Sequence, residues 1–294
     1  MSSKHSDDPT ALTESFHYEN ATHSYDIKWC QLGNPASPPL IFVHGTSWSS
    51  RVWVPFALGL ARQFHVYLFD NPGFGASPLE VQLLEKEFDP ADEVTKLDAD
   101  LARQSAVFSA LFKTWEKEWS DQRAHVIAHD HGGLMSLRAY LLHNCQYASL
   151  CLIDVVAIGP FGQPLFTSAA ENPTQFQQLP KTGFKDILDS YIRNAAFFEL
   201  PSDFMQMLRA PWLRERGREG FIRQLCQANS RSTEAVEGRY GEFGQEVPIL
   251  ILWGAQDSWE AGHLAMYDQP AQLGLELGRW LGTFTRGTVE LHDH

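Results

Sequence analysis

The chain has little positive charge and no long apolar run. Its 294 residues carry 23 Lys and Arg against 36 Asp and Glu, which gives a formal net charge of −13. The basic residues form no stripe that could neutralise a phosphate backbone, so we expect no nucleic-acid partner. No apolar segment approaches the length that crosses a bilayer, and the polar start Met1–Asp8 lacks the apolar region of a secretion signal. We therefore expect a cytoplasmic protein with no membrane partner.

Cysteine pairs and metal-binding spacings are also missing. Cys30, Cys145, Cys151 and Cys226 are far apart and contain no CxxC pair, so we expect buried free thiols. The twelve histidines show no HExxH or similar metal spacing. The glycine-rich turn Asp70–Ser77 lacks the GxGxxG or GxxxxGK spacing of a phosphate loop. The sequence thus predicts no metal and no cofactor.

What the chain does have is enough apolar sequence for a large core, since 44% of its residues are hydrophobic. Short apolar segments alternate with stretches of helical periodicity. These segments are Pro39–His44, Phe64–Asp70, Ala124–His129, Ser149–Asp154 and Val247–Gly254. This alternation predicts an α/β fold with a mostly parallel sheet and helices on both faces.

The alternation is interrupted between residues 159 and 245, where helical patterns rich in Phe, Tyr, Trp and Met take over. Such an insertion predicts a helical cap over the carboxyl ends of the strands, where ligands bind in sheets of this kind. The expected organisation is a disordered N-terminus (1–12), the first part of the core (13–158), the cap (159–245) and the second part of the core (246–294).

The turn around Asp130 carries the strongest chemical signal. An apolar strand ends in Ala128-His-Asp-His-Gly132, and Gly133–Leu142 continues with helical periodicity. Small residues around a strand–turn–helix junction are typical of a nucleophile elbow, here with Asp in place of Ser. A carboxylate that attacks a saturated carbon forms an ester that water can hydrolyse, whereas a serine would form an ether. Asp130 therefore indicates epoxide opening or halide displacement, and a simple helix N-cap is the alternative.

Five short motifs occur in a fixed order along the chain: His44–Ser47, Asp70–Ser77, His129–Gly133, Trp253–Asp257 and Ala261–Leu264. Together, over residues 38 to 282, they resemble the α/β-hydrolase superfamily, in the branch that holds epoxide hydrolases and haloalkane dehalogenases. The resemblance implies an α/β-hydrolase fold with a helical cap.

By this resemblance, Asp130 is the nucleophile, Asp257 the orienting acid and His263 the base that activates water. The roles fit the chemistry, because a histidine base needs an acceptor on its second ring nitrogen to fix its tautomer. Some dehalogenase branches take the acid from the strand end where Asp154 lies. Asp154 is thus an alternative acid, or only a capping carboxylate.

The resemblance breaks between Asp257 and His263, which only five residues separate. The family has a helix and a further strand there, and such a crossover needs about a dozen residues or more. One helix and the last strand are therefore missing, and the strand at 247–254 becomes an exposed edge. Six virtual bonds reach about 20 Å, so Asp257 and His263 can still meet. A working but fragile enzyme, a non-catalytic relative, and a gene-model or splicing artefact all stay open.

Two positions beside the nucleophile bear on the substrate. Dehalogenases of this branch hold the halide with a Trp directly after the nucleophile or an Asn after the first His-Gly. This chain has His131 and Thr46 there, so neither halide donor is retained. The same two residues match the positions whose backbone amides form the oxyanion hole.

Epoxide hydrolases need phenol groups from the cap, and Tyr191 and Tyr240 lie in the right region, although each can equally be a packing residue. Trp212 and its aromatic neighbours predict an apolar substrate site. We therefore expect a hydrolase, with weakened activity, that opens an epoxide in a small apolar substrate. A dehalogenase, an ester or C–C hydrolase, and a non-catalytic binding protein are the alternatives, and the oligomeric state is left open.

Overall fold

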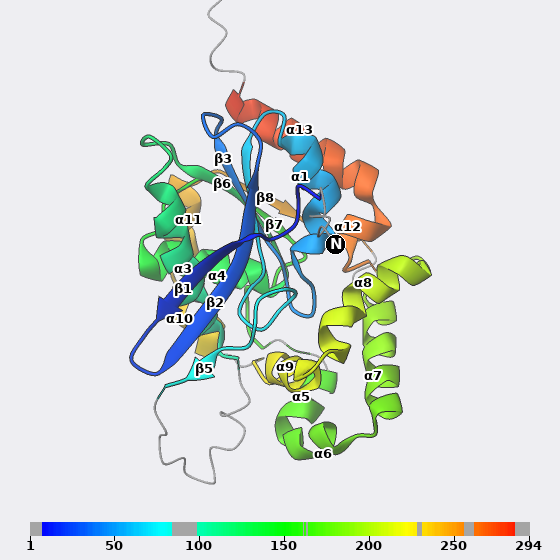
Figure 1. Ribbon diagram of the computed structural model, residues 1–294. Helices are drawn as coiled ribbons and strands as arrows, with labels where there is room; N and C mark the ends of the chain where they lie inside the picture. The colour runs from blue at the N-terminus through cyan, green and yellow to red at the C-terminus, as the bar shows by residue number, and fades with distance from the viewer. Residues whose placement is uncertain are drawn as a thin grey trace, which may run out of the picture.

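A computed structural model describes residues 8–83, 99–160, 162, 164–227, 231–255 and 262–285. Within these residues the chain forms an eight-stranded sheet that has helices on both faces (Figure 1). Residues 1–7 of the expected disordered N-terminus lie outside the described residues, as does Asp257.

The sheet has an antiparallel end and a parallel body. β1 (Glu14–Glu19) pairs antiparallel with β2 (His23–Leu32), and β2 pairs antiparallel with β4 (His65–Phe69) and with β5 (Val81–Gln82). The body of the sheet adds four strands that run parallel to β4: β3 (Pro39–Val43), β6 (Ala124–His129), β7 (Tyr147–Ile153) and β8 (Ile249–Leu252). Every residue of β3, β4 and β6 is buried, as expected for a parallel sheet whose two faces are both covered by helices. The predicted mostly parallel sheet is confirmed.

The helices fall into three groups in Figure 1. One face of the sheet carries α1 (Val54–Leu60), α12 (Ala265–Asp268) and α13 (Pro270–Thr285), with the short 3-10 helix η1 (Ser50–Trp53). The other face carries α3 (Leu101–Glu116), α4 (His131–His143), α10 (Arg231–Glu237) and α11 (Tyr240–Glu246). At one end of the sheet lie α5 (Pro164–Glu171), α6 (Pro173–Gln178), α7 (Lys181–Asn194), α8 (Ser202–Leu213) and α9 (Gly217–Leu225). The limits of a separate cap domain stay a prediction.

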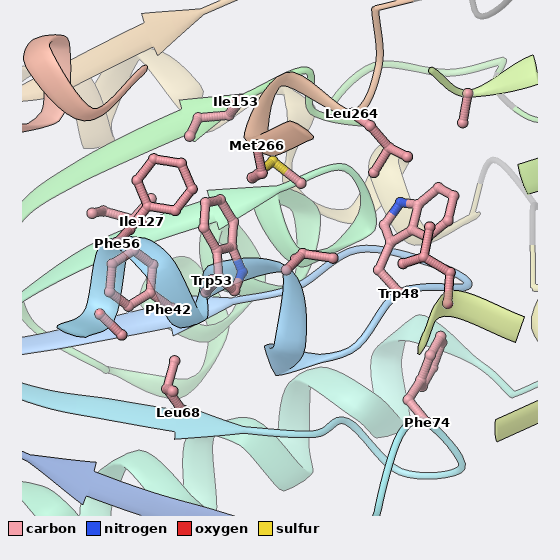
Figure 2. Packing of buried hydrophobic residues seen from close by; sticks show 14 of the residues in the cluster. Phe42, Trp48, Trp53, Phe56, Leu68, Phe74, Ile127, Ile153, Leu264 and Met266 are labelled. Carbon is pink, nitrogen blue, oxygen red and sulfur yellow. The ribbon is translucent and has the colours of Figure 1, made fainter. Parts of the chain in front are cut away.

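Large side chains from distant parts of the sequence fill the core on the α1 face. Figure 2 shows Trp53 and Phe56 packed among Phe42, Ile127 and Met266. Burying an apolar side chain of this size contributes roughly 1.5–3 kcal/mol to stability. Since Met266 belongs to the same cluster, the chain just after position 263 is anchored in the core.

β8 is the last strand in the order of the sheet and forms its edge. Its Ile251 is 65% exposed, which is unusual for a large apolar side chain in a strand. Among the described residues beyond β8 there are helices α12 and α13 and no further strand. Over the described residues the sheet therefore ends at β8, and the predicted exposed edge is confirmed.

The four cysteines are buried free thiols, as predicted. Within the described parts of the chain, no helix combines the length and apolar character needed to cross a membrane.

Candidate active site

Asp130 lies at the junction of β6 and α4 with a strained backbone. Its φ of 50° and ψ of −128° are rare for a residue with a side chain. The side chain is fully buried and makes no capping hydrogen bond to α4, so the simple N-cap interpretation of Asp130 is wrong. Val156 and Gly133 donate backbone hydrogen bonds to the carbonyl oxygen of Asp130 at 3.3 and 2.9 Å. Two backbone hydrogen bonds thus hold the turn at Asp130, and the carboxylate takes no part in capping α4.

The loop after β3 brings a backbone donor to this carboxylate. The amide of Thr46 donates to Oδ2 of Asp130 at 2.7 Å. The close approach requires Gly45, because a Cβ there would lie 2.5 Å from the Cβ of Asp130. Asn71 donates its amide to Nε2 of His44, so the proton of this imidazole sits on Nδ1 and is donated to the carbonyl oxygen of Gly45. His44 therefore shapes the loop.

His263 reaches the carboxylate of Asp130 despite the short connection that precedes it. Its Nε2 is 3.9 Å from Oδ1 of Asp130, and both side chains are almost fully buried. Nε2 of His129 lies 2.8 Å from the backbone carbonyl oxygen of His263 and must donate, since a carbonyl only accepts. The next amide, of Leu264, donates to the carbonyl oxygen of Ala195 at the end of α7. Packing and two hydrogen bonds to its backbone thus fix the segment that carries His263.

The charges around Asp130 favour its ionised form. Burial alone raises the pKa of this carboxyl, but the imidazoles of His131, His263 and His129, when protonated, and the Thr46 amide outweigh burial and lower the pKa below its ordinary value. The lowered pKa favours the carboxylate form of Asp130.

A buried polar network fixes the neighbouring His131. Gln227 donates from Nε2 to Oγ1 of Thr46 at 2.7 Å and to Nδ1 of His131 at 3.3 Å, and Thr46 also contacts Nδ1. Because Nδ1 accepts, the neutral imidazole carries its proton on Nε2. Burial lowers the pKa of His131, which also favours the neutral form. Sequence reasoning missed Gln227, although a polar residue just after the buried stretch Phe221–Leu225 was a signal for it.

The orienting acid is less well defined. Asp257 lies outside the described residues. Asp154 ends β7 with a φ of 44° and accepts a hydrogen bond from the amide of Gly254 at 2.6 Å. It shares the lining of a cavity of about 540 Å³ with Gly262, the residue before His263. The choice between the two acids stays a prediction.

The predicted cap residues separate into two sets. Trp212 of α8 donates from Nε1 to the carbonyl oxygen of Ser47 at 3.1 Å, and Tyr191 of α7 stacks on Trp48 with ring centroids 6.2 Å apart. Burial and the nearby Asp130 raise the pKa of Tyr191, so its phenol stays protonated. The hydroxyl of Tyr240 instead donates to the carbonyl oxygen of Ala157 at 2.5 Å, on the loop after β7. The structure therefore brings Tyr191 and Trp212 to the loop after β3, whereas Tyr240 contacts the loop after β7.

A cavity of about 500 Å³ adjoins the nucleophile. Asp130 and His131 line it together with the loop after β7, Phe166 of α5, Ile251 of β8 and Trp253 just after β8. A volume of this order suits a small organic ligand.

The fold and the elbow geometry define the class of protein. The sequence profile of the alpha/beta hydrolase family matches residues 40–277. The chain belongs to this family.

Curated relatives within the family carry different activities. The chain is 25% identical over 239 residues to the dihydrolipoyllysine-residue acetyltransferase component of the acetoin cleaving system of Pseudomonas putida, covering 79% of this chain and 55% of that protein. It is 26% identical over 187 residues to the pimeloyl-acyl-carrier-protein methyl ester esterase of Aeromonas hydrophila, covering 61% of this chain and 62% of the esterase. The chain thus spans little more than half the length of these relatives.

Solved structures resemble the chain over most of its length. An alpha/beta hydrolase fold protein from Burkholderia ambifaria is 29% identical, with a TM-score of 0.72, and 90% of this chain and 97% of that chain are covered. A provisionally assigned epoxide hydrolase from Pseudomonas aeruginosa is 18% identical, with a TM-score of 0.65 and coverage of 94% and 98%. A haloalkane dehalogenase loop variant from Bradyrhizobium elkanii is 16% identical, with a TM-score of 0.59 and coverage of 92% and 96%. At these last two identities the likeness concerns the fold.

Proposed function

We propose that the protein is a hydrolase that opens an epoxide to a diol through a covalent ester on Asp130. The observation that carries the proposal is the buried, ionised carboxylate of Asp130 in a strained elbow, with the Thr46 amide on one oxygen and His263 near the other. A carboxylate so placed can attack a saturated carbon, and the resulting ester can be cleaved by water.

In the first step, Oδ1 of Asp130 forms a bond to an epoxide carbon, and the ring C–O bond breaks with its electron pair on oxygen. The protonated phenol of Tyr191, close enough for the charge of Asp130 to raise its pKa, supplies the proton to that oxygen. The product is a hydroxyalkyl ester of Asp130.

In the second step, His263 removes a proton from a water molecule whose oxygen adds to the carboxyl carbon of Asp130. A gap of 3.9 Å between the imidazole and the carboxylate is suited to a water-mediated contact. Oδ2 receives the developing negative charge and keeps the Thr46 amide as donor. Collapse of this intermediate breaks the bond between the carboxyl carbon and the ester oxygen and expels the diol, whose new hydroxyl takes its proton from His263. The proton that stays on the carboxyl of Asp130 returns to the phenolate of Tyr191, so that both groups regain their starting state.

Two features support epoxide opening over halide displacement. The indole and carboxamide donors that hold a halide in the resembled dehalogenases are replaced by His131 and Thr46. Tyr191 also provides a buried, protonated phenol within electrostatic reach of Asp130, and ring opening requires such a proton donor whereas halide displacement does not.

Isotope labelling tests the proposal. In a single turnover of a styrene-type epoxide in H₂¹⁸O, the peptide that contains Asp130 should gain one heavy oxygen. Asp130→Asn should form no diol, and bromoalkanes should release no halide. Label found in the diol alone would overturn the covalent route, and halide release without diol formation would reassign the chemistry to a dehalogenase. A folded protein that binds apolar ligands without turnover and is indifferent to His263→Ala would be a non-catalytic binding protein.

A further inference from the structure

The cavity beside Asp130 has ionisable side chains at one end and an apolar lining elsewhere. Asp130 and His131 contribute its ionisable groups at one end. The rest of its described lining is aliphatic, aromatic or glycine, and includes Val155–Ile158, Phe166, Ile251 and Trp253. A ligand in this cavity can therefore place one polar or reactive atom at Asp130 and must present apolar surface everywhere else.

The apolar wall is rigidly connected to the nucleophile. The amide of Val156 donates to the carbonyl oxygen of Asp130 at 3.3 Å. Val155 packs tightly on α4, since a Cβ on Gly133 would lie 2.3 Å from its Cγ1. The distance from the attacking carboxylate to this wall is thus set by backbone contacts.

The far end of the cavity opens at the edge of the sheet. Three of its lining residues are large apolar side chains that face solvent: Ile158 is 69% exposed, Ile251 is 65% exposed and Trp253 is 58% exposed. Ile251 belongs to the edge strand β8, beyond which the described residues add no strand. Clustered exposed apolar side chains of this kind mark a ligand or interaction site.

We propose that this cavity binds an unbranched alkyl chain of the substrate, which extends from the reactive carbon at Asp130, along Val155–Ile158, to the β8 edge at Ile251 and Trp253. The inference rests on the proposed function, because it takes Asp130 as the point of attack. It narrows the substrate class to terminal epoxides with a linear hydrocarbon tail.

If the alkyl tail binds in this cavity, affinity and kcat/KM should rise regularly with the length of the tail. Each buried methylene should improve binding, and kcat/KM, by roughly three- to fourfold until the chain reaches the exposed mouth, beyond which the gain should stop. A carboxylate introduced at the exposed end of the cavity should reduce this rise in affinity and kcat/KM, because a charge there opposes burial of the terminal methylenes.

Two assays on the full chain test the site separately from the chemistry. Titration calorimetry with unreactive 1-alkanols from butanol to dodecanol measures the tail site, and diol formation from 1,2-epoxyalkanes of the same lengths measures the reaction. Ile251→Glu and Trp253→Glu should flatten the chain-length dependence in both assays. Leu275→Glu, a matched change of a 60% exposed residue on α13 outside this cavity, should leave it unchanged.

The outcomes separate the two proposals. The tail site is supported if alkanol affinity grows with chain length in the wild type and in Leu275→Glu, and if Ile251→Glu removes this dependence on chain length. This result supports the tail site even if no epoxide is turned over. Epoxide turnover with no chain-length dependence keeps the reaction and overturns the tail site. The same slope in the wild type and all three variants also overturns it.

Discussion

The imidazole of His129 donates a hydrogen bond of 2.8 Å to the backbone carbonyl oxygen of His263, and the two rings lie 4.7 Å apart. The residue before the nucleophile thus holds the residue proposed as the base. This contact joins the end of β6 to the segment that carries His263.

We expect His129→Phe to slow hydrolysis of the ester more than its formation, because a loosened His263 activates water poorly. The loss should be about ten- to a hundredfold in steady-state turnover, with ester accumulating on Asp130. Intact-protein mass spectrometry during turnover would detect it. His129→Gln keeps an N–H at a similar place and should restore most of the rate. Equal loss in both variants, without ester accumulation, would assign His129 to packing alone.

Gly45→Ala should reduce turnover by about a hundredfold, because the new methyl group would push the Thr46 amide away from Asp130. Gly59 of α1 offers a matched control, since nothing lies within 4 Å of a Cβ placed there. Gly59→Ala should keep full activity and stabilise the helix by about 0.5–1 kcal/mol. Initial rates and thermal melts of both variants test this prediction. Unchanged rates in Gly45→Ala would show that turnover does not depend on the contact between the Thr46 amide and Asp130.

Tyr191→Phe should slow epoxide opening by about a hundredfold or more if this phenol supplies the proton. Tyr240→Phe is the natural comparison, because that hydroxyl is bonded to Ala157 and should have no effect on the rate. Rapid-quench measurement of ester formation isolates the step. A normal rate in Tyr191→Phe would leave it a packing residue.

His125 should make the folded state sensitive to acid. Burial lowers its pKa to about 4, against an ordinary value near 6.5, while Nδ1 lies 2.8 Å from Oγ of Ser149. Above pH 6.5 neither state is protonated, so the residue has no effect. As the pH falls from 6.5 towards 4 the unfolded chain gains the proton first, and stability is lost, by about 2 kcal/mol at pH 5.

Urea unfolding at pH 8 and pH 5 would measure this loss, and His125→Gln should remove it. His17 provides a control of opposite sign, because its hydrogen bond to the exposed Asp26 raises its pKa. His17→Gln should leave the acid sensitivity in place. An unchanged pH slope in His125→Gln would contradict the assignment.

The sequence predicted most of the fold because the signals were local. Continuous apolar runs marked β3, β4 and β6, and small residues around Asp130 marked the elbow. The five residues between Asp257 and His263 were enough to predict the exposed edge at β8.

The contacts that support the candidate site depend on tertiary structure and could not be predicted in this way. The bond between His129 and His263 joins residues 134 positions apart, and that between Gln227 and Thr46 joins residues 181 apart. The sequence left a working but fragile enzyme as one interpretation of the shortened segment. It did not anticipate that Leu264 and Met266 would be buried in the core.

The position of β8 at the rim of the sheet explains how a chain could lose a strand there and keep its architecture. Each strand in a parallel sheet bonds only to its immediate neighbours, so removing the outermost unit leaves the ladders between β3, β6 and β7 intact. The nucleophile lies after β6, two places inside the edge. The hydrogen bonds that hold β6 in the sheet therefore do not depend on what lies beyond β8, and changes at that rim leave the turn at Asp130 in place.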